Sequence, residues 1–236
     1  GDGGFPDGAS ATTELGNSTG ASLGPLDLGD GATVAASVVT TSTATANATT
    51  GSAEAEVLLA ADEGSRVTGL DLTANPNTDS NSISGDGSLQ AEVRLNSNAT
   101  ATTTTGAASS TVNAGVVQGT YLGAAETSIG GEGTVAGAIT MAATSEATNV
   151  GGGDVTATAS LEGAKGLSQD DSTTRASLLV KGDGNLTGTV SNTAKVTATS
   201  SAGGAAAAGF AAATAKGPAA GAGASAAFTA PHVPPA

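Results

Sequence analysis

The chain contains no cysteine and no tryptophan, and only 2% of its 236 residues are aromatic. The absence of cysteine excludes disulfides and thiolate metal sites, so no covalent framework holds the chain together. There is a single histidine, His232, and it lies in an irregular segment between Pro231 and Pro234. Nucleophilic catalysis by a Ser/His/Asp arrangement is therefore not expected, and no spacing of the acidic residues selects a catalytic carboxylate pair. We expect a protein that is not an enzyme and needs no cofactor.

Positive charge is also scarce, because the formal net charge is -14. The basic residues are scattered along the chain: Arg66, Arg94, Arg175, Lys165, Lys181, Lys195 and Lys216. Binding of nucleic acid needs a clustered positive surface, so nucleic acid is not an expected partner. No apolar run approaches the roughly 18 residues of a membrane helix, so we expect no membrane span.

Large apolar residues are few, since Leu, Ile, Val and Phe together make up about 16% of the chain. That fraction and the net charge are typical of disorder. However, only 12% of residues are charged, and Ala, Gly, Thr and Ser dominate. Alanine buries little apolar area, which argues against a thick core. Thin, closely stacked sheets are more consistent with this composition.

Four long runs alternate small or apolar residues with polar ones. Successive side chains of a strand point to opposite faces, so each run predicts a strand with one buried and one solvated face. Large residues stand at the start of each run and alanines towards its end, which predicts a core that narrows along the strand. The runs cover residues 34–48, 89–104, 135–148 and 186–199.

A Gly-acid-Gly motif precedes each run and returns at intervals of roughly 50 residues, a spacing typical of repeat architectures. A glycine-bearing turn and a second, shorter alternating run follow each long run, which predicts hairpins. The fold class is all-β, with four repeats of long strand, Gly turn and strand, arranged as a β-solenoid or a long-stranded β-sandwich. The expected organisation is an N-terminal arm (1–22), a four-repeat β domain (23–217, with units 23–79, 80–124, 125–172 and 173–217) and a Gly/Ala/Pro-rich tail (218–236).

The acidic residues of the motif are candidate calcium ligands, because calcium takes carboxylate and carbonyl oxygens. They are Asp30, Asp86, Glu132 and Asp183. A turn role is the alternative, since Asp and Gly both favour turns, and it is the preferred interpretation. No metal is therefore assigned.

Four Asn-x-Ser/Thr sequons occur, which is close to the number that this composition produces by chance. They begin at Asn17, Asn47, Asn98 and Asn185. If the chain is secreted by a glycosylating cell, glycans are expected first on Asn47 and Asn98, which fall on the solvated face of their strands.

Threonines alternate along the long runs, as in Thr41/Thr43/Thr45 and Thr100/Thr102/Thr104. These arrays resemble those of insect hyperactive antifreeze proteins, and the resemblance implies a flat face of hydroxyl and methyl groups that binds ice. The sequence departs from that pattern where charged residues interrupt the same face: Glu92, Arg94, Glu146 and Lys195.

A long, regular and weakly charged strand edge templates pairing with another chain. The leading hypothesis is therefore a secreted structural protein that assembles with copies of itself into an extracellular or cell-surface filament, fibre or layer. Residues 1–22 and 203–230 are expected to carry the interface. The aromatic candidates for assembly are Phe5, Phe210 and Phe228. An ice-binding protein is the first alternative, and an adhesin or phage-fibre shaft is the second.

Overall fold

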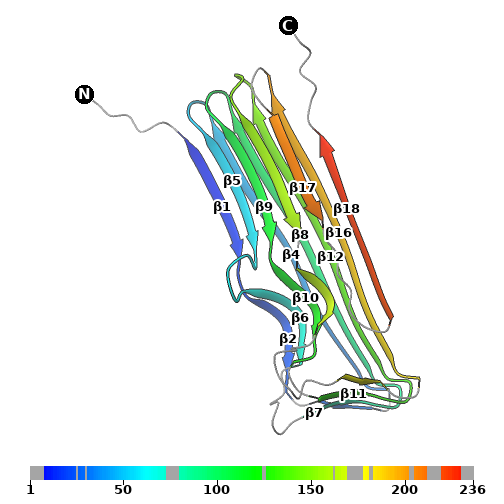
Figure 1. Cartoon of the computed structure of the whole chain (residues 1–236). Coiled ribbons are helices and arrows are strands. Elements are labelled where there is room, and N and C mark those ends of the chain that lie inside the picture. The colour runs from blue at the N-terminus through cyan, green and yellow to red at the C-terminus, as the bar shows by residue number, and fades with distance from the viewer. Residues whose placement is uncertain are drawn as a thin grey trace.

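The computed structural model describes residues 8–24, 26–29, 31–72, 80–123, 126–161, 163–168, 178–180, 183–201, 205–211 and 219–229. These residues form strands, turns and bends, with no helix among them. The strands build four sheets, and all strand pairs are parallel (Figure 1). The prediction of an all-β chain is confirmed.

The longest sheet, sheet D, contains the four long runs. Its pairing follows the order β18-β16-β12-β8-β4, and Val34, Leu89, Val135 and Leu186 occupy one register position. The apolar parity of each run faces inward and the polar parity faces outward, as the alternation predicts. The strands are β4 (Thr33–Ala48), β8 (Ser88–Thr103), β12 (Thr134–Asn149), β16 (Asn185–Ser200) and β18 (Ala219–Thr229).

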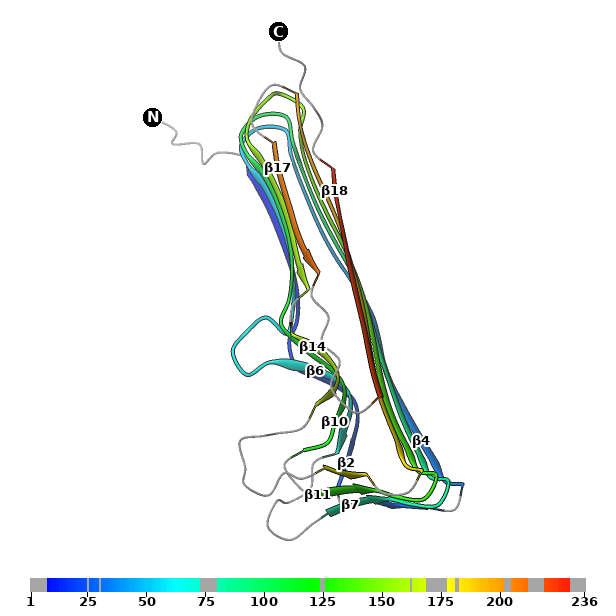
Figure 2. The ribbon, with the colours of Figure 1, turned by 45° about the vertical axis from the view of Figure 1, so that its right-hand side comes forward.

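Sheet A lies opposite the second half of the long strands, in the order β1-β5-β9-β13-β17 (Figure 2). Its inward residues are mostly small, among them Ala55, Ser110 and Ala157, which share a register position. The strands are β1 (Ala9–Leu15), β5 (Ala53–Leu59), β9 (Ala108–Ala114), β13 (Val155–Leu161) and β17 (Ala205–Ala211). The strands β1 and β18 fall within the segments assigned to an arm and a tail.

Two smaller sheets complete the structure. Sheet B contains β2 (Ser18–Leu23), β6 (Arg66–Leu72), β10 (Val116–Tyr121) and β14 (Ala164–Ser168). Sheet C contains β3 (Asp27–Leu28), β7 (Ser80–Ile83), β11 (Glu126–Ile129) and β15 (Leu178–Val180). The chain visits sheets A, B, C and D in that order and then returns to sheet A, an arrangement compatible with a β-solenoid.

The prediction of hairpins is wrong, because each long strand and the shorter strand after it lie in different sheets. Gly51, Gly106 and Gly152 have φ values of 79°, 90° and 94° in the connections from sheet D to sheet A. These turns move the chain to the opposite layer (Figure 2), where it pairs with strands that lie about 50 residues away in sequence. The period-two pattern is the same in either arrangement, so it could not distinguish them.

Three further strands, β6, β10 and β14, follow the shorter alternating runs, where the alternation predicts none. Their sequences do not alternate cleanly because each carries a central glycine. These glycines follow one another across sheet B at Gly20, Gly69, Gly119 and Gly166.

This glycine stripe brings the backbone of sheet B against sheet D. A Cβ on Gly69 would lie 2.7 Å from the carbonyl oxygen of Gly119 and 3.2 Å from the Cβ of Ala91. A Cβ on Gly166 would lie 2.8 Å from the Cα of Gly188. The core accordingly consists of two clusters, one between sheets A and D around Ile139 and one between sheets B, C and D around Leu70.

Buried polar side chains tie the turns between sheets D and A to the end of each long strand. Asn149 is 1% exposed, accepts hydrogen bonds from the N–H groups of Gly151 and Gly152 (2.8 Å each), and donates to the carbonyl of Gly106. In the neighbouring strand, the Thr103 hydroxyl donates to the carbonyl of Gly51 at 2.8 Å. One column of side chains therefore fixes successive turns.

We expect Asn149→Ala to lower the free energy of unfolding by about 2 kcal/mol. The substitution removes three hydrogen bonds made by a buried side chain, each with a net value of about 0.5–1.5 kcal/mol. Urea unfolding followed by circular dichroism measures the change. Asn47→Ala, at an exposed outward position, is the matched control with an expected effect within about 0.5 kcal/mol. Equal effects of the two variants would contradict the turn-fixing role.

Candidate functional site

The two ends of the stacked sheets are strand edges. Within the described residues, β4 pairs with β8 alone and β1 with β5 alone, while at the other end β18 pairs with β16 alone and β17 with β13 alone. The outermost strands of sheets A and D are therefore β1 and β4 at one end and β17 and β18 at the other.

The hydrogen bonds of β4 identify which backbone groups face its open edge. Ala32 and Ala48 accept from the next strand, through the N–H groups of Ser88 and Thr104 at 2.9 and 3.3 Å. The N–H and C=O groups of successive residues in a strand point to opposite sides. The backbone groups of even-numbered residues of β4 therefore point towards β8, and those of odd-numbered residues point towards the open edge, outward from the stack. One of those outward carbonyls, that of Thr43, accepts from the Thr13 hydroxyl at 2.7 Å.

The edge strands of sheet D carry no charged residue and no proline, whereas its interior strands do carry charges. These interior charges are Glu92 and Arg94 in β8, Glu146 in β12 and Lys195 in β16. Sheet edges in monomeric proteins are commonly protected by charged side chains or proline. Sheet D has the reverse distribution, with its charges in the middle.

The interior charges form pairs on the outward face of sheet D. Arg94 Nε lies 2.6 Å from Glu92 Oε1, and Lys195 Nζ lies 3.7 Å from Glu146 Oε1. The side chains of Lys195 and Glu146 are 59% and 42% exposed, so they project from the face that carries the threonines. This counts against the flat hydroxyl and methyl grid that ice binding would require.

Sheet A has a different outward face, on which Glu14, Glu54 and Glu56 alternate with inward residues. The hydrogen bond between Glu14 and Asp62, together with the charge of Asp62, raises the pKa of the Glu14 carboxyl above its usual value of 4.5. Two carboxyl groups therefore lie within hydrogen-bonding distance of each other at the end of the stack where β1 is the outermost strand.

We expect Glu14→Gln to stabilise the protein at pH 7 and to lose this advantage near pH 4.5. A carboxyl whose pKa is raised in the folded state penalises folding when it is ionised, and this penalty disappears as the pH falls through the folded pKa to the unfolded one. The penalty is measured as the difference in melting temperature between variant and wild type, determined at both pH values. Glu54→Gln is the matched control, since it removes one carboxylate from the same face. A difference that does not change with pH would contradict the pairing.

The acidic motif lies in the four-residue connections from sheet C to sheet D. The last residue of each strand of sheet C stands five residues before the first residue of the next long strand, so the four connections can be aligned position by position. In this alignment Asp86, Glu132 and Asp183 share one position, and Gly31 occupies it in the first connection. Asp30 lies outside the described residues. In the described part of the chain, no group of three or more His, Cys, Asp or Glu side chains is arranged to hold a metal ion.

These connections are turns. Gly87 N–H donates to the carbonyl of Ser84 and Gly133 N–H to that of Gly130, both at 3.0 Å. Gly31, Gly85 and Gly131 have φ values of 76°, 59° and 63°. The side chains of Asp86 and Glu132, which follow Gly85 and Gly131, are exposed, which is consistent with the turn role.

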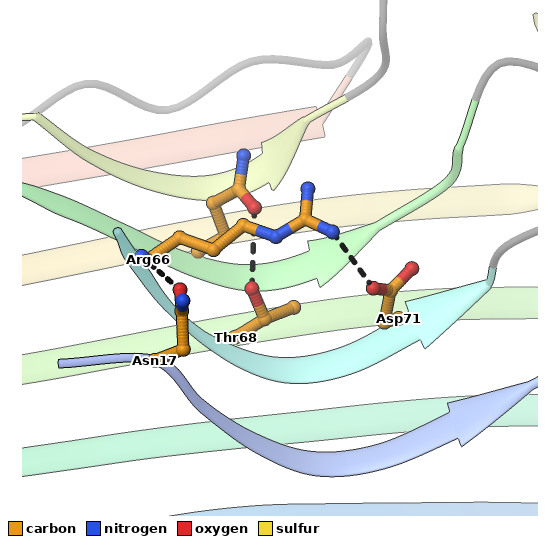
Figure 3. Close-up of polar contacts among 5 residues, drawn as sticks. Asn17, Arg66, Thr68 and Asp71 are labelled. Atoms are coloured by element: carbon orange, nitrogen blue, oxygen red, sulfur yellow. Dashed lines mark hydrogen bonds and ion pairs between the residues drawn. The ribbon is translucent and has the colours of Figure 1, made fainter. Parts of the chain in front are cut away.

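A polar cluster that the sequence did not predict lies on sheet B (Figure 3). Arg66 Nη2 lies 3.2 Å from the buried carboxylate of Asp71, and its guanidinium stands 4.8 Å from the ring centre of Tyr121. The backbone N–H of Arg66 donates to Asn17 Oδ1 at 2.9 Å, and Thr68 donates to Gln118 at 3.2 Å.

The cluster joins residues of β6 and β10 to the turn after β1, so its contacts cross between successive strands of the stack. It contains no nucleophile paired with a base. We interpret it as a stabilising contact between neighbouring strands, because its one buried carboxylate is already neutralised by Arg66. Strand alternation could not reveal it, since Asn17, Arg66 and Gln118 come from three successive repeats.

The four sequons occupy different environments. Asn47, Asn98 and Asn185 lie at outward positions of sheet D, and Asn17 is exposed at the turn after β1. Phe210 and Phe228 belong to the edge strands β17 and β18, and Phe5 and His232 lie outside the described residues.

The chain matches no protein-family model, no curated protein sequence and no solved structure at a significant level. Among the described residues there is no helix that is long and apolar enough to cross a membrane. The function is therefore argued from the edges and faces of the sheets.

Proposed function

We propose that this protein is a secreted structural subunit, built as a β-solenoid of four repeats, that polymerises end to end into an extracellular filament. The open edge formed by β17 and β18 of one copy pairs with the edge formed by β1 and β4 of the next. The function is mechanical, and the protein has no catalytic mechanism.

The observation that carries this proposal is the absence of charge and proline from both edge strands of sheet D. Within each sheet the described strands all run in the same direction, so the two ends of the stack expose complementary rather than identical edges. A contact between two different surfaces of the same chain generates an open polymer unless a rotation closes it. Strand addition at such edges is an established mode of recognition.

The charge distribution supports an orderly polymer. The chain carries 21 acidic and 7 basic residues, and acidic side chains such as Glu54, Glu132 and Asp183 lie on outward positions away from the sheet D edges. Repulsion between these acidic surfaces opposes contact through them and keeps the polymer soluble. Glycans on the sequons would add to this solubility where the producing cell attaches them.

Negative-stain electron microscopy of the purified chain at increasing concentration tests the proposal. We expect filaments above a critical concentration, and we expect none after deletion of residues 219–236, which removes β18. A wild-type protein that remains monomeric at millimolar concentration would overturn it. Thermal hysteresis from such a monomer would instead favour the ice-binding alternative.

A further inference from the structure

We infer that the outward face of sheet D is a second self-association surface, which packs against the same face of another copy. End-to-end pairing uses the strand edges, whereas this contact uses the flat side of the sheet. The inference goes beyond the proposed filament and does not depend on it, because two monomers can pair through this face alone. In a polymer, it would join filaments into pairs.

Charge is the first argument for a second copy as the occupant. The described outward residues of sheet D include two acids and two bases, Glu92 with Arg94 and Glu146 with Lys195, so the face is electrically neutral. The whole chain carries a net charge of -14. Two copies that approach through this face avoid the repulsion that opposes contact elsewhere.

The outward face of sheet A provides the internal comparison. Glu14, Glu54 and Glu56 lie on it, and no basic residue accompanies them in the described strands of this sheet. Sheet A therefore repels a copy of itself. Among the two large sheets, only sheet D is electrostatically suited to face-to-face packing.

Shape is the second argument. The long side chains of β8 stand among small residues of β4 and β12. A hollow of about 450 Å³ lies beside Gln90 and Glu92, with a floor of small residues from the neighbouring strands: Ala35, Ser37, Ala136 and Ala138. A second hollow of about 250 Å³ lies further along, beside Arg94 and Asn96.

The second hollow is bordered by Val39, which is the most exposed of the large apolar residues in the described chain at 68%. Side chains that stand above a floor of alanines interdigitate when two such sheets pack at a spacing of about 10 Å. The face thus offers both projections and recesses to an identical partner.

Area is the third argument. A strand of 16 residues spans about 50 Å at about 3.3 Å per residue, and four strands about 4.8 Å apart span about 19 Å. The face therefore measures about 1,000 Å² per copy. A stable protein interface buries about 800 Å² per partner, so the face is large enough for specific pairing.

The test introduces two acids at the floor of the face through Ala138→Glu together with Ala142→Glu. Both positions point outward, so the fold tolerates them. The matched control is Thr156→Glu with Thr158→Glu, which adds the same charge to the outward face of sheet A. The protein is produced in a bacterium without N-glycosylation, because a glycan on Asn98 would itself separate the faces.

Electron microscopy measures filament width, and sedimentation equilibrium of the full chain below the critical concentration for filaments measures pairing. We expect wild type and control to pair, and the Ala138→Glu/Ala142→Glu variant to form single filaments with a pairing Kd raised at least about 100-fold. Unchanged pairing in that variant, equal loss in the control, or a wild type without pairing would overturn the inference. Pairing without filaments would overturn only the end-to-end proposal.

Discussion

Replacing Gly119 by alanine is expected to lower the free energy of unfolding by about 3 kcal/mol or more. A Cβ at this position would clash with the carbonyl oxygen of Gly166 and lie 2.9 Å from the carbonyl carbon of Gly137. Both obstacles are backbone atoms, which cannot rotate away as a flexible side chain can. Overpacking typically costs about 1–3 kcal/mol and more where nothing can move.

The glycine stripe makes this effect larger than that of one local clash. Gly69 and Gly166 lie in the neighbouring strands of sheet B, so a displacement at Gly119 is transmitted along the stripe. Stabilities of folded domains are about 5–15 kcal/mol. The double variant Gly69→Ala/Gly119→Ala is therefore expected to be largely unfolded at 25 °C.

Circular dichroism during thermal and urea unfolding measures both variants. The control is Gly130→Ala, since a Cβ at Gly130 would have no neighbouring atom within 4 Å. That variant is expected to change stability by less than about 1 kcal/mol. A Gly119→Ala protein as stable as this control would show that sheets B and D are not in backbone contact.

The long strands were predictable because alternation reports burial directly. Val93 and Val190 face inward and Arg94 and Lys195 face outward, as their parity in the sequence requires. Alternation says nothing about the neighbour to which a strand is hydrogen-bonded, and so it could not separate hairpins from parallel stacking. Turn residues were equally ambiguous, since a glycine with positive φ serves both arrangements.

The strands of sheet B were missed because local pattern and tertiary packing conflict there. In β6 the sequence Val67-Thr68-Gly69-Leu70 has a glycine where a side chain would continue the alternation, and glycine is depleted in strands. The close contact with sheet D is the reason for that glycine. A repeat signal was nevertheless present, because Gly20, Gly69, Gly119 and Gly166 recur at intervals of about 50 residues.

The acidic motif shows the limit of reading repeats by eye. The sequence aligns Asp30 with Asp86, but strand register puts Gly31 at the position of Asp86. In the first connection, the residue that matches the motif and the residue that is structurally equivalent to Asp86 are therefore neighbours and not the same residue. The absence of charge from β4 was visible in the sequence, but its meaning depends on β4 being an edge strand, which only the order of strands establishes.

Proline at an odd-numbered position of β4 is expected to prevent filament formation while leaving the fold intact. The N–H of Thr41 points to the open edge, so Thr41→Pro removes a donor that the next copy would use and spares the bonds between β4 and β8. Proline is tolerated on edge strands where its nitrogen faces solvent. Thr41→Pro/Thr45→Pro removes two such donors.

Each lost backbone hydrogen bond is worth about 0.5–1.5 kcal/mol, and the proline rings also obstruct the incoming strand. Because about 1.4 kcal/mol is a tenfold change in an equilibrium constant, the critical concentration should rise at least about tenfold for Thr41→Pro and further for the double variant. Pelleting assays and electron microscopy measure it. Thr41→Ala controls for the loss of the side chain and should polymerise as wild type does.

Thr40→Pro provides the opposite control, one residue away. Its N–H faces β8, so this proline breaks the sheet itself and should lower the melting temperature, which Thr41→Pro should change little. The pair of substitutions separates assembly from stability within one strand. Normal polymerisation by a folded Thr41→Pro/Thr45→Pro protein would rule out β4 as the acceptor edge, because no strand could then pair there along its full length.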